Sequence, residues 1–169
     1  MKHGSDYVLT PAGADLEPVF MMIGEWAVRW AFITEPADDD QLDPVPLLWW
    51  MHRRIDVERL PDRRVVVEFD LRGATTSRLW LLLERSGPSV CIKFPGFDPD
   101  LVVTAPVREL YRAFGGRTTF ADALAAGSIR VDGPPKLARA LPTWFQWSPF
   151  YTAMRAAVSS GSPSAPARP

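Results

Sequence analysis

The sequence predicts an α+β fold with a five-stranded, mainly antiparallel sheet and helices on one face. The first observation is that short apolar segments, joined by polar or glycine-containing connections, fill the middle of the chain. This pattern is typical of antiparallel hairpins. The second is that segments with helix start and stop signals follow these strands. The third is a hydrophobic content of 47% in 169 residues, enough to bury a core in one domain.

A long helix is expected near the N-terminus, over about residues 11–33, after a short strand. Thr10 can cap this helix, and Pro11 suits its first position because that nitrogen needs no hydrogen-bond partner. Pro18 lies inside the expected helix and should bend its first turns. A stripe of large apolar side chains recurs at spacings of three and four: Leu16, Phe20, Ile23, Trp26 and Trp30. We expect this stripe to form a homodimer interface, with docking on the rest of the chain as the alternative.

Composition divides the chain into four parts. Residues 1–35 hold the first strand and the long helix. Residues 36–60 are a linker rich in proline and aspartate, followed by a short apolar helix. Residues 61–150 form the sheet domain. Residues 151–169 are an extension expected to be mostly disordered, because its end is small and polar.

Strands and helices of the sheet domain are expected in a fixed order. The expected strands are 63–71, 77–87, 89–96, 100–105 and 128–133, and the expected helices are 106–116, 118–127 and 134–145. Alternation in the first strand places Val65, Val67 and Phe69 on one face. We expect that face to meet the helices.

The single cysteine, Cys91, excludes an intramolecular disulfide and a cysteine-based zinc site, which fits a reducing cytoplasm. Val90, Ile92 and Phe94 share one face of the third strand, so Cys91 points away from the main core. A formal net charge of −1 gives no overall basic field that would draw in nucleic acid or an anionic membrane. No apolar run approaches the roughly 20 residues of a membrane span. We therefore expect a cytoplasmic protein.

Residues suited to catalysis are few. His3 lies in the leader and His52 beside two arginines, with no nucleophile elbow, phosphate loop or dinucleotide fingerprint to accompany them. The acidic run 38–40 lacks the glycine and glutamate of a calcium loop, so we interpret it as a solvated loop. We expect no enzyme, no cofactor and no metal site.

The aromatic residues leave two interpretations open. They could form an ordinary core, or the C-terminal segment "LPTWFQWSPFYTAM" could close an apolar cavity that binds an apolar ligand. The stretch "PGFDPDLVVTAPVRELYRAFGGRTTFADALAAGSIRVDGPPKLARALPTWF" resembles the second half of a sterol-carrier-protein type domain. That resemblance implies that a sterol, acyl chain or similar lipid lies in a tunnel between sheet and helices. Our physical candidates for its lining are Phe69, Trp80, Leu82, Phe114, Phe120, Leu124 and Phe145.

The N-terminal stretch "YVLTPAGADLEPVFMMIGEWAVRW" is similar to the end of an HxlR-type winged helix-turn-helix regulator. The positions that fit are Tyr7, Leu9, Thr10, Gly13, Leu16, Pro18, Val19, Trp26 and Trp30. A known fusion joins that family to a sterol-carrier-like domain through "W-x-M-R-R-R-x-D", and this chain has "WWMHRRID". The resemblance implies a lipid-sensing transcriptional regulator that binds DNA only if N-terminal helices upstream of this chain are present. The alternative is a stand-alone lipid or sterol carrier.

Overall fold

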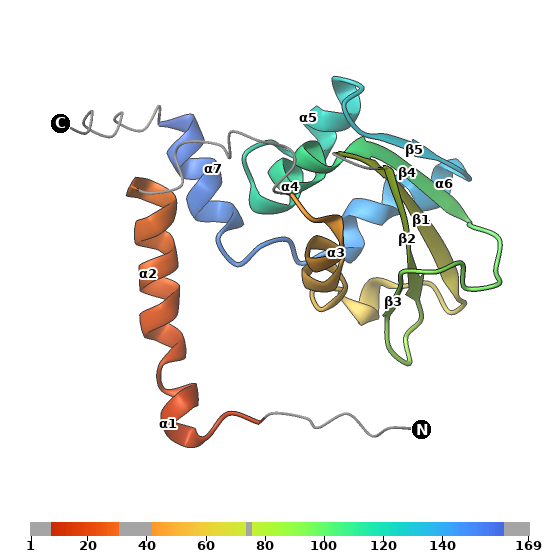
Figure 1. Cartoon of the computed structure of the whole chain (residues 1–169). Coiled ribbons are helices and arrows are strands. Elements are labelled where there is room, and N and C mark those ends of the chain that lie inside the picture. The colour runs from red at the N-terminus through yellow and green to blue at the C-terminus, as the bar shows by residue number, and fades with distance from the viewer. Residues whose placement is uncertain (1–7, 31–41, 74–75, 161–169) are drawn as a thin grey trace.

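The computed structural model describes residues 8–30, 42–73 and 76–160, and it confirms the α+β class (Figure 1). The five strands of its single sheet are β1 (Val65–Arg72), β2 (Thr76–Leu83), β3 (Ser89–Cys91), β4 (Leu101–Pro106) and β5 (Arg130–Asp132). They lie in the order β3-β2-β1-β4-β5. All neighbours are antiparallel except β1 and β4, which run parallel.

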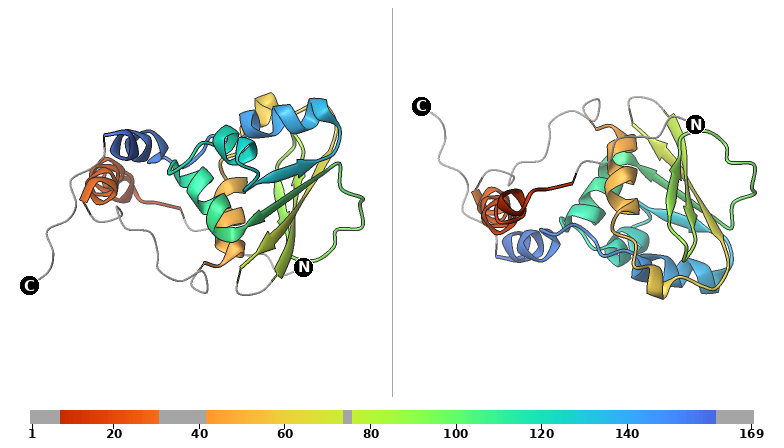
Figure 2. Two further views of the ribbon diagram at one scale, coloured as in Figure 1. Left: turned by 90° about the horizontal axis from the view of Figure 1, so that it is seen from above. Right: turned by 90° about the horizontal axis from the view of Figure 1, so that it is seen from below.

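Helices cover one face of this sheet (Figure 2). They are α3 (Pro44–His52), α4 (Val107–Gly115), α5 (Phe120–Ala125) and α6 (Pro135–Ala140), with short 3-10 turns η2 (Val57–Arg59) and η3 (Leu141–Trp144). The expected facing of β1 is confirmed, because Val65, Val67 and Phe69 are fully buried in the core between sheet and helices. Burying these apolar side chains supplies most of the free energy that holds the two layers together.

Helix ends follow the cap signals of the sequence. The Thr119 hydroxyl accepts a hydrogen bond from the Asp122 nitrogen at 2.9 Å and begins α5. Asp43 begins α3 in the same way through the Val45 nitrogen at 2.8 Å. Gly116 ends α4 in the left-handed region, with φ of 90°. A β-carbon there would lie 2.6 Å from the Tyr151 carbonyl oxygen, so only glycine fits this turn.

The N-terminal helix differs from the expectation in two ways. It is divided into α1 (Pro11–Ala14) and α2 (Glu17–Trp30), because Pro18 has no N–H to donate back to the preceding turn and is tolerated only at the start of a helix. Pro18 is therefore the second residue of α2 and does not bend one long helix, and residues 31–33 lie outside the described residues. Residues 8–10 pair with no strand in the described structure, so the N-terminal strand stays a prediction.

The C-terminal extension is also more ordered than expected. Tyr151–Ser159 form a helix, α7, and α2 packs alongside it (Figures 1 and 2). The prediction of a mostly disordered 151–169 is wrong for this part, because Met154 is buried on the inner side of α7. Residues 161–169 lie outside the described residues.

The third strand is shorter than expected. β3 ends at Cys91, and both Ile92 and Phe94 are exposed although Val90 packs against the core. Phe94 instead turns its ring edge-on to Trp80, with 6.0 Å between the ring centroids. The chain leaves the sheet here because it must cross β2 and β1 to place β4 beside β1.

Candidate ligand-binding pocket

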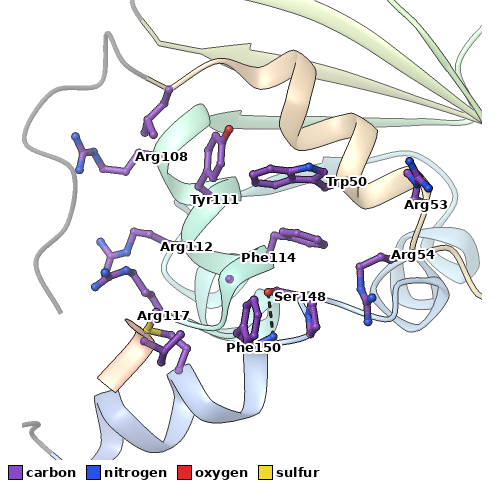
Figure 3. A pocket seen from close by; sticks show the side chains of 15 residues that line it. Trp50, Arg53, Arg54, Arg108, Tyr111, Arg112, Phe114, Arg117, Ser148 and Phe150 are labelled. Atoms are coloured by element: carbon purple, nitrogen blue, oxygen red, sulfur yellow. Dashed lines mark hydrogen bonds between the residues drawn. The ribbon is translucent and has the colours of Figure 1, made fainter. Parts of the chain in front are cut away.

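An open pocket of about 860 Å³ lies where α2, α3, α4 and α7 approach one another. Its lining comes from segments far apart in the sequence, on the side of the helical layer away from the sheet. The apolar part of the lining consists of Val28, Leu42, Trp50, Phe114, Pro149, Phe150 and Met154, beside Tyr111 and Gly115. Figure 3 shows the rings of Trp50, Tyr111, Phe114 and Phe150 arranged around it.

One wall of the pocket is the segment 146–150, which Arg54 holds in place. The Arg54 Nε donates to the carbonyl oxygens of Gln146, at 2.8 Å, and Trp147. The backbone also pairs here, since the Gln146 nitrogen donates to the Arg54 carbonyl at 2.7 Å. From α4, the Phe114 carbonyl accepts from the Ser148 nitrogen at 3.1 Å. The wall is therefore tied to both α3 and α4 by hydrogen bonds.

Arginines surround the apolar lining. They are Arg53, Arg54, Arg108, Arg112 and Arg117, and no aspartate or glutamate of the described ranges lines the pocket. In Figure 3 they form two groups, with Arg53 and Arg54 on one side of the aromatic rings and the other three on the opposite side. The Arg112 guanidinium lies 3.3 Å from the Glu109 carboxylate. The pocket thus combines an apolar interior with a positively charged rim.

Tyr111 contributes a hydroxyl at the edge of the pocket. It donates a hydrogen bond to the Asp43 carbonyl oxygen at 2.9 Å and so ties α4 to the start of α3. Burial raises the pKa of the Tyr111 hydroxyl above its ordinary value, and the charge of Asp43 adds to the rise. The hydroxyl therefore stays protonated and acts as a donor at neutral pH.

Most candidates for a tunnel lining are core residues. Phe69, Phe114, Phe120 and Phe145 all lie in the core cluster between sheet and helices, with Phe69 only 1% exposed. Of the seven candidates, only Phe114 also lines the pocket.

Trp80, Leu82 and Leu124 lie elsewhere. Trp80 and Leu82 are opposite Glu68 and Val66 in the sheet, so they point to the face away from the helices. The Trp80 indole N–H donates to the Glu68 carboxylate at 3.1 Å. Leu124 is partly exposed on α5.

The aromatic C-terminal segment divides between core and pocket. Trp144 and Phe145 are buried in the core, whereas Phe150 lines the pocket. Trp147 packs against the core, because its ring lies near those of Phe120 and Phe145, at 5.7 and 5.6 Å between centroids, and the same ring lies 6.0 Å from that of Tyr151 at the start of α7.

Sequence reasoning missed Trp50, the arginines and Met154 as pocket residues. The short apolar helix at the end of residues 36–60 was expected, but its sequence gave no sign that 148–154 would lie against it. No local pattern connects residues about a hundred positions apart.

The expected dimer stripe is exposed on α2. Leu16, Phe20, Ile23, Trp26 and Trp30 all face solvent, with Phe20 65% and Trp26 60% exposed. The other side of α2 packs toward α7 and the pocket through Gly24 and Val28. The alternative of docking the stripe on the rest of the chain does not occur in the described residues.

Side chains outside the pocket add little to the functional interpretation. Among the described residues, no group of three or more His, Cys, Asp or Glu side chains could hold a metal ion. His52 hydrogen-bonds through Nδ1 to the Trp49 carbonyl oxygen at 2.8 Å, and its ring meets that of Trp49 edge-on. In the same ranges, no helix has both the length and the apolar character needed to cross a membrane.

Comparison with solved structures places the fold beside two kinds of protein. Over 65% of this chain, the structure is similar to the stereoselective inverting sec-alkylsulfatase Pisa1 from Pseudomonas sp., with a TM-score of 0.54 and 14% identity. The match spans only 17% of the sulfatase chain. At this identity the likeness concerns the fold alone.

Structures of sterol carrier proteins are also similar to this chain. Palmitated SCP2L2 from Aedes aegypti matches over 57% of this chain and 88% of its own, with a TM-score of 0.48 and 21% identity. Sterol Carrier Protein 2 Like 2 from the same organism gives a TM-score of 0.41 at 16% identity. No protein-family model and no curated protein sequence matches the chain. The resemblance of residues 5–33 to an HxlR-type regulator has no counterpart in the structures named here.

Proposed function

We propose that this chain is a binding or carrier protein for an apolar small molecule, which lies in the pocket between α2, α3, α4 and α7. The observation that carries this proposal is the pocket itself, with its volume of about 860 Å³ and aromatic lining. Pockets of roughly 300–1,000 Å³ with a mainly apolar lining are typical of small-molecule sites. An apolar ligand gains about 0.8 kcal/mol for each CH₂ group that it buries.

A binding role is proposed in place of catalysis because the pocket offers no pair of reactive groups. In the part of the chain that the structure describes, its lining contains no Asp, Glu, His or Cys side chain that could act as a general base. The Ser148 hydroxyl accepts a hydrogen bond from the Phe150 nitrogen at 3.2 Å and so serves the turn that begins α7. Tyr111 is engaged with the Asp43 carbonyl. These groups hold the wall of the pocket and leave nothing suited to activating a nucleophile.

Gly115 offers a direct test. It lies in α4 at the pocket, and a β-carbon placed on it would meet no atom within 4 Å. Gly115→Phe should therefore occupy part of the pocket without a clash at the β-carbon, and phenylalanine is also the better helix former. Ala125→Phe, on the exposed side of α5, adds the same ring outside the pocket and serves as the control.

The experiment combines native mass spectrometry with displacement of a fluorescent fatty acid. We expect the unmodified chain and Ala125→Phe to bind the probe, and Gly115→Phe to bind it at least tenfold more weakly. Probe binding that is equal in all three proteins would place the ligand elsewhere, for example in the predicted tunnel near Phe120. Absence of binding to the unmodified chain, with only bare protein in the mass spectrum, would refute the binding role.

We also propose that two copies of the chain pair through the exposed stripe of α2. The stripe has the same spacing in both directions from Ile23, since Phe20 and Trp26 lie three positions away and Leu16 and Trp30 seven. Two antiparallel α2 helices can therefore be related by a two-fold axis at Ile23. In that arrangement the apolar side chains of one copy lie opposite those of the other.

Charge favours the same arrangement. α2 has Glu17 in its first turn and Arg29 in its last turn. In an antiparallel pair, the acidic end of each helix lies beside the basic end of the other, and the helix dipoles oppose each other. A parallel pair would bring like charges together. A second copy of this chain is thus the occupant that the stripe fits.

A further inference from the structure

We infer that the ligand of the pocket is an amphiphile with an anionic headgroup, held by Arg53 and Arg54 at the end of α3, with its tail among the aromatic rings. This inference rests on the proposed binding function and adds the chemical class of the ligand. A carboxylate, sulfate or phosphate group shares the chemistry required: negative charge and several acceptor oxygens for guanidinium donors.

The charged side chains that line the pocket are positive. Among the described residues, five arginines and no acidic side chain line the pocket, and Glu109 pairs with Arg112 from outside the lining. A cleft lined by one sign of charge and by apolar walls concentrates its field toward the interior. A cationic ligand is disfavoured there, and a neutral one gains nothing from the rim.

The described partners of Arg53 and Arg54 do not neutralise their charge. Arg54 donates from Nε to two carbonyl oxygens, which are neutral acceptors, and this fixes its orientation. Neither Arg53 nor Arg54 forms an ion pair within the described ranges 8–30, 42–73 and 76–160. Their charges are therefore uncompensated by the described part of the chain.

Arg53 and Arg54 lie next to the apolar lining of the pocket. Arg53 and Arg54 directly follow α3, whose Trp50 lines the same pocket. Figure 3 shows Trp50 and Phe114 beside them, with Phe150 across the pocket. A ligand whose head meets the two guanidinium groups can direct an apolar tail across Phe114 toward Phe150 and Met154. Charge and apolar surface thus meet within one pocket, as an amphiphile requires.

The closing experiment compares ligands with one ten-carbon tail and different heads, at concentrations where they remain monomeric. Decanoate, decyl sulfate and decyl phosphate represent the anionic class, 1-decanol is neutral and decyltrimethylammonium is cationic. Isothermal titration calorimetry with the full chain should show all or some of the anions binding at least tenfold more tightly than decanol, and the cation binding most weakly. The ranking of the three anions identifies the headgroup.

A charge variant locates the head. The Arg53 side chain is exposed and forms no hydrogen bond or ion pair with the described residues, so Arg53→Gln should retain the fold. We expect it to weaken binding of the best anion by about three- to tenfold and to leave decanol unchanged, the range of a partly exposed charge pair. Arg139→Gln removes an exposed arginine on α6 outside the pocket and should change neither. Added salt should weaken anion binding to the unmodified chain more than to Arg53→Gln.

The outcomes separate this inference from the proposed function. Equal binding of decanoate, decyl sulfate, decyl phosphate and decanol would overturn the anionic head and leave the apolar binding site intact. An anion preference as large in Arg53→Gln and in Arg54→Lys as in the unmodified chain would overturn the assignment of the head to these two residues. No binding of any of the five ligands would overturn both the inference and the binding function.

Discussion

Gly24 in α2 lies directly against the ring of Phe150, and a β-carbon on Gly24 would come within 2.1 Å of the Phe150 Cζ. Glycine in the middle of a helix costs roughly 1 kcal/mol relative to alanine. Here it allows the ring to approach the α2 backbone, which places α2 beside α7 and brings Val28 to the pocket. The position of the N-terminal helix therefore depends on this one contact more than on helix propensity.

The first prediction is that Gly24→Ala displaces α2 from α7. The methyl group and the Phe150 ring cannot occupy the same space, and overpacking of this kind costs about 1–3 kcal/mol. Hydrogen exchange should become faster in Glu17–Trp30, or the midpoint of urea unfolding should fall. The double variant Gly24→Ala, Phe150→Ala should recover part of the loss, because the smaller side chain at 150 makes room.

Gly13→Ala provides the matched control. A β-carbon on Gly13 would meet its neighbours at 3.5 Å, an ordinary contact, so this change in α1 should be neutral or slightly stabilising. If Gly24→Ala leaves exchange in α2 and the unfolding midpoint unchanged, the ring does not fix α2.

The second prediction concerns the exposed stripe of α2. Ile23→Asp should convert a dimer to a monomer, because the two-fold axis would bring two carboxylates together on an apolar surface. Sedimentation equilibrium distinguishes a single 18.9 kDa chain from a particle of twice that mass. Thr152→Asp places the same charge on the exposed side of α7 and should leave the dimer intact. A monomer for the unmodified chain would contradict the pairing.

The third prediction concerns Asp100, which joins the parallel strands β1 and β4. Its Oδ2 accepts from the Val66 nitrogen at 2.8 Å, and its Oδ1 lies 2.9 Å from the Arg63 guanidinium. Asp100→Ala leaves the Val66 N–H without its partner, so the free energy of unfolding should fall by about 1–3 kcal/mol in a urea titration.

Asp98→Ala is the control, since Asp98 is exposed and should change stability by less than about 0.5 kcal/mol. Arg63→Gln removes the exposed ion pair and a hydrogen bond to the Arg64 carbonyl but keeps the Val66 N–H paired, so it should cost less than Asp100→Ala. Equal effects of Asp100→Ala and Asp98→Ala would show that the strand pairing does not need this carboxylate.

The fourth prediction is a pH dependence at Glu84. The hydrogen bond from Arg64 holds the pKa of the Glu84 carboxyl below its ordinary value of 4.5. A lowered pKa in the folded state means that the stabilisation is present above about pH 4.5 and is lost as pH falls through the folded pKa.

NMR titration of the Glu84 side chain measures this directly. Arg64→Gln should return the pKa toward its ordinary value, whereas Ser86→Ala, which removes a weaker hydrogen bond at 3.2 Å, should shift it less. An unchanged Glu84 pKa in Arg64→Gln would disprove the assigned cause.

Much of the fold follows from local sequence signals. Alternation in β1 placed Val65, Val67 and Phe69 in the core, because side chains on a strand point to opposite faces in turn. Threonine caps and glycine stops marked the ends of α4 and α5, because free N–H groups and left-handed turns have few chemical solutions. These signals act over a few residues, so they can be recognised from the sequence alone.

Some local signals were interpreted over too long a segment. Pro18 marks the start of α2, although the apolar stripe alone suggested one helix from 11 to 33. α7 carried weak periodicity beside a small, polar end, so composition suggested disorder. In both places packing against another element decided the outcome: α7 is helical where Met154 is buried and α2 lies alongside it.

The sequence by itself determined the class of the fold, the order of its elements and the inward face of its first strand. Tertiary structure alone decided the parallel pairing of β1 with β4, the division of the aromatic residues between core and pocket, and the pocket itself. Trp50, Phe114 and Phe150 line that pocket from three separate segments, together with Arg53 and Arg54. The physical reason is that periodicity records which way a side chain points along its own helix or strand, whereas a pocket depends on which elements meet.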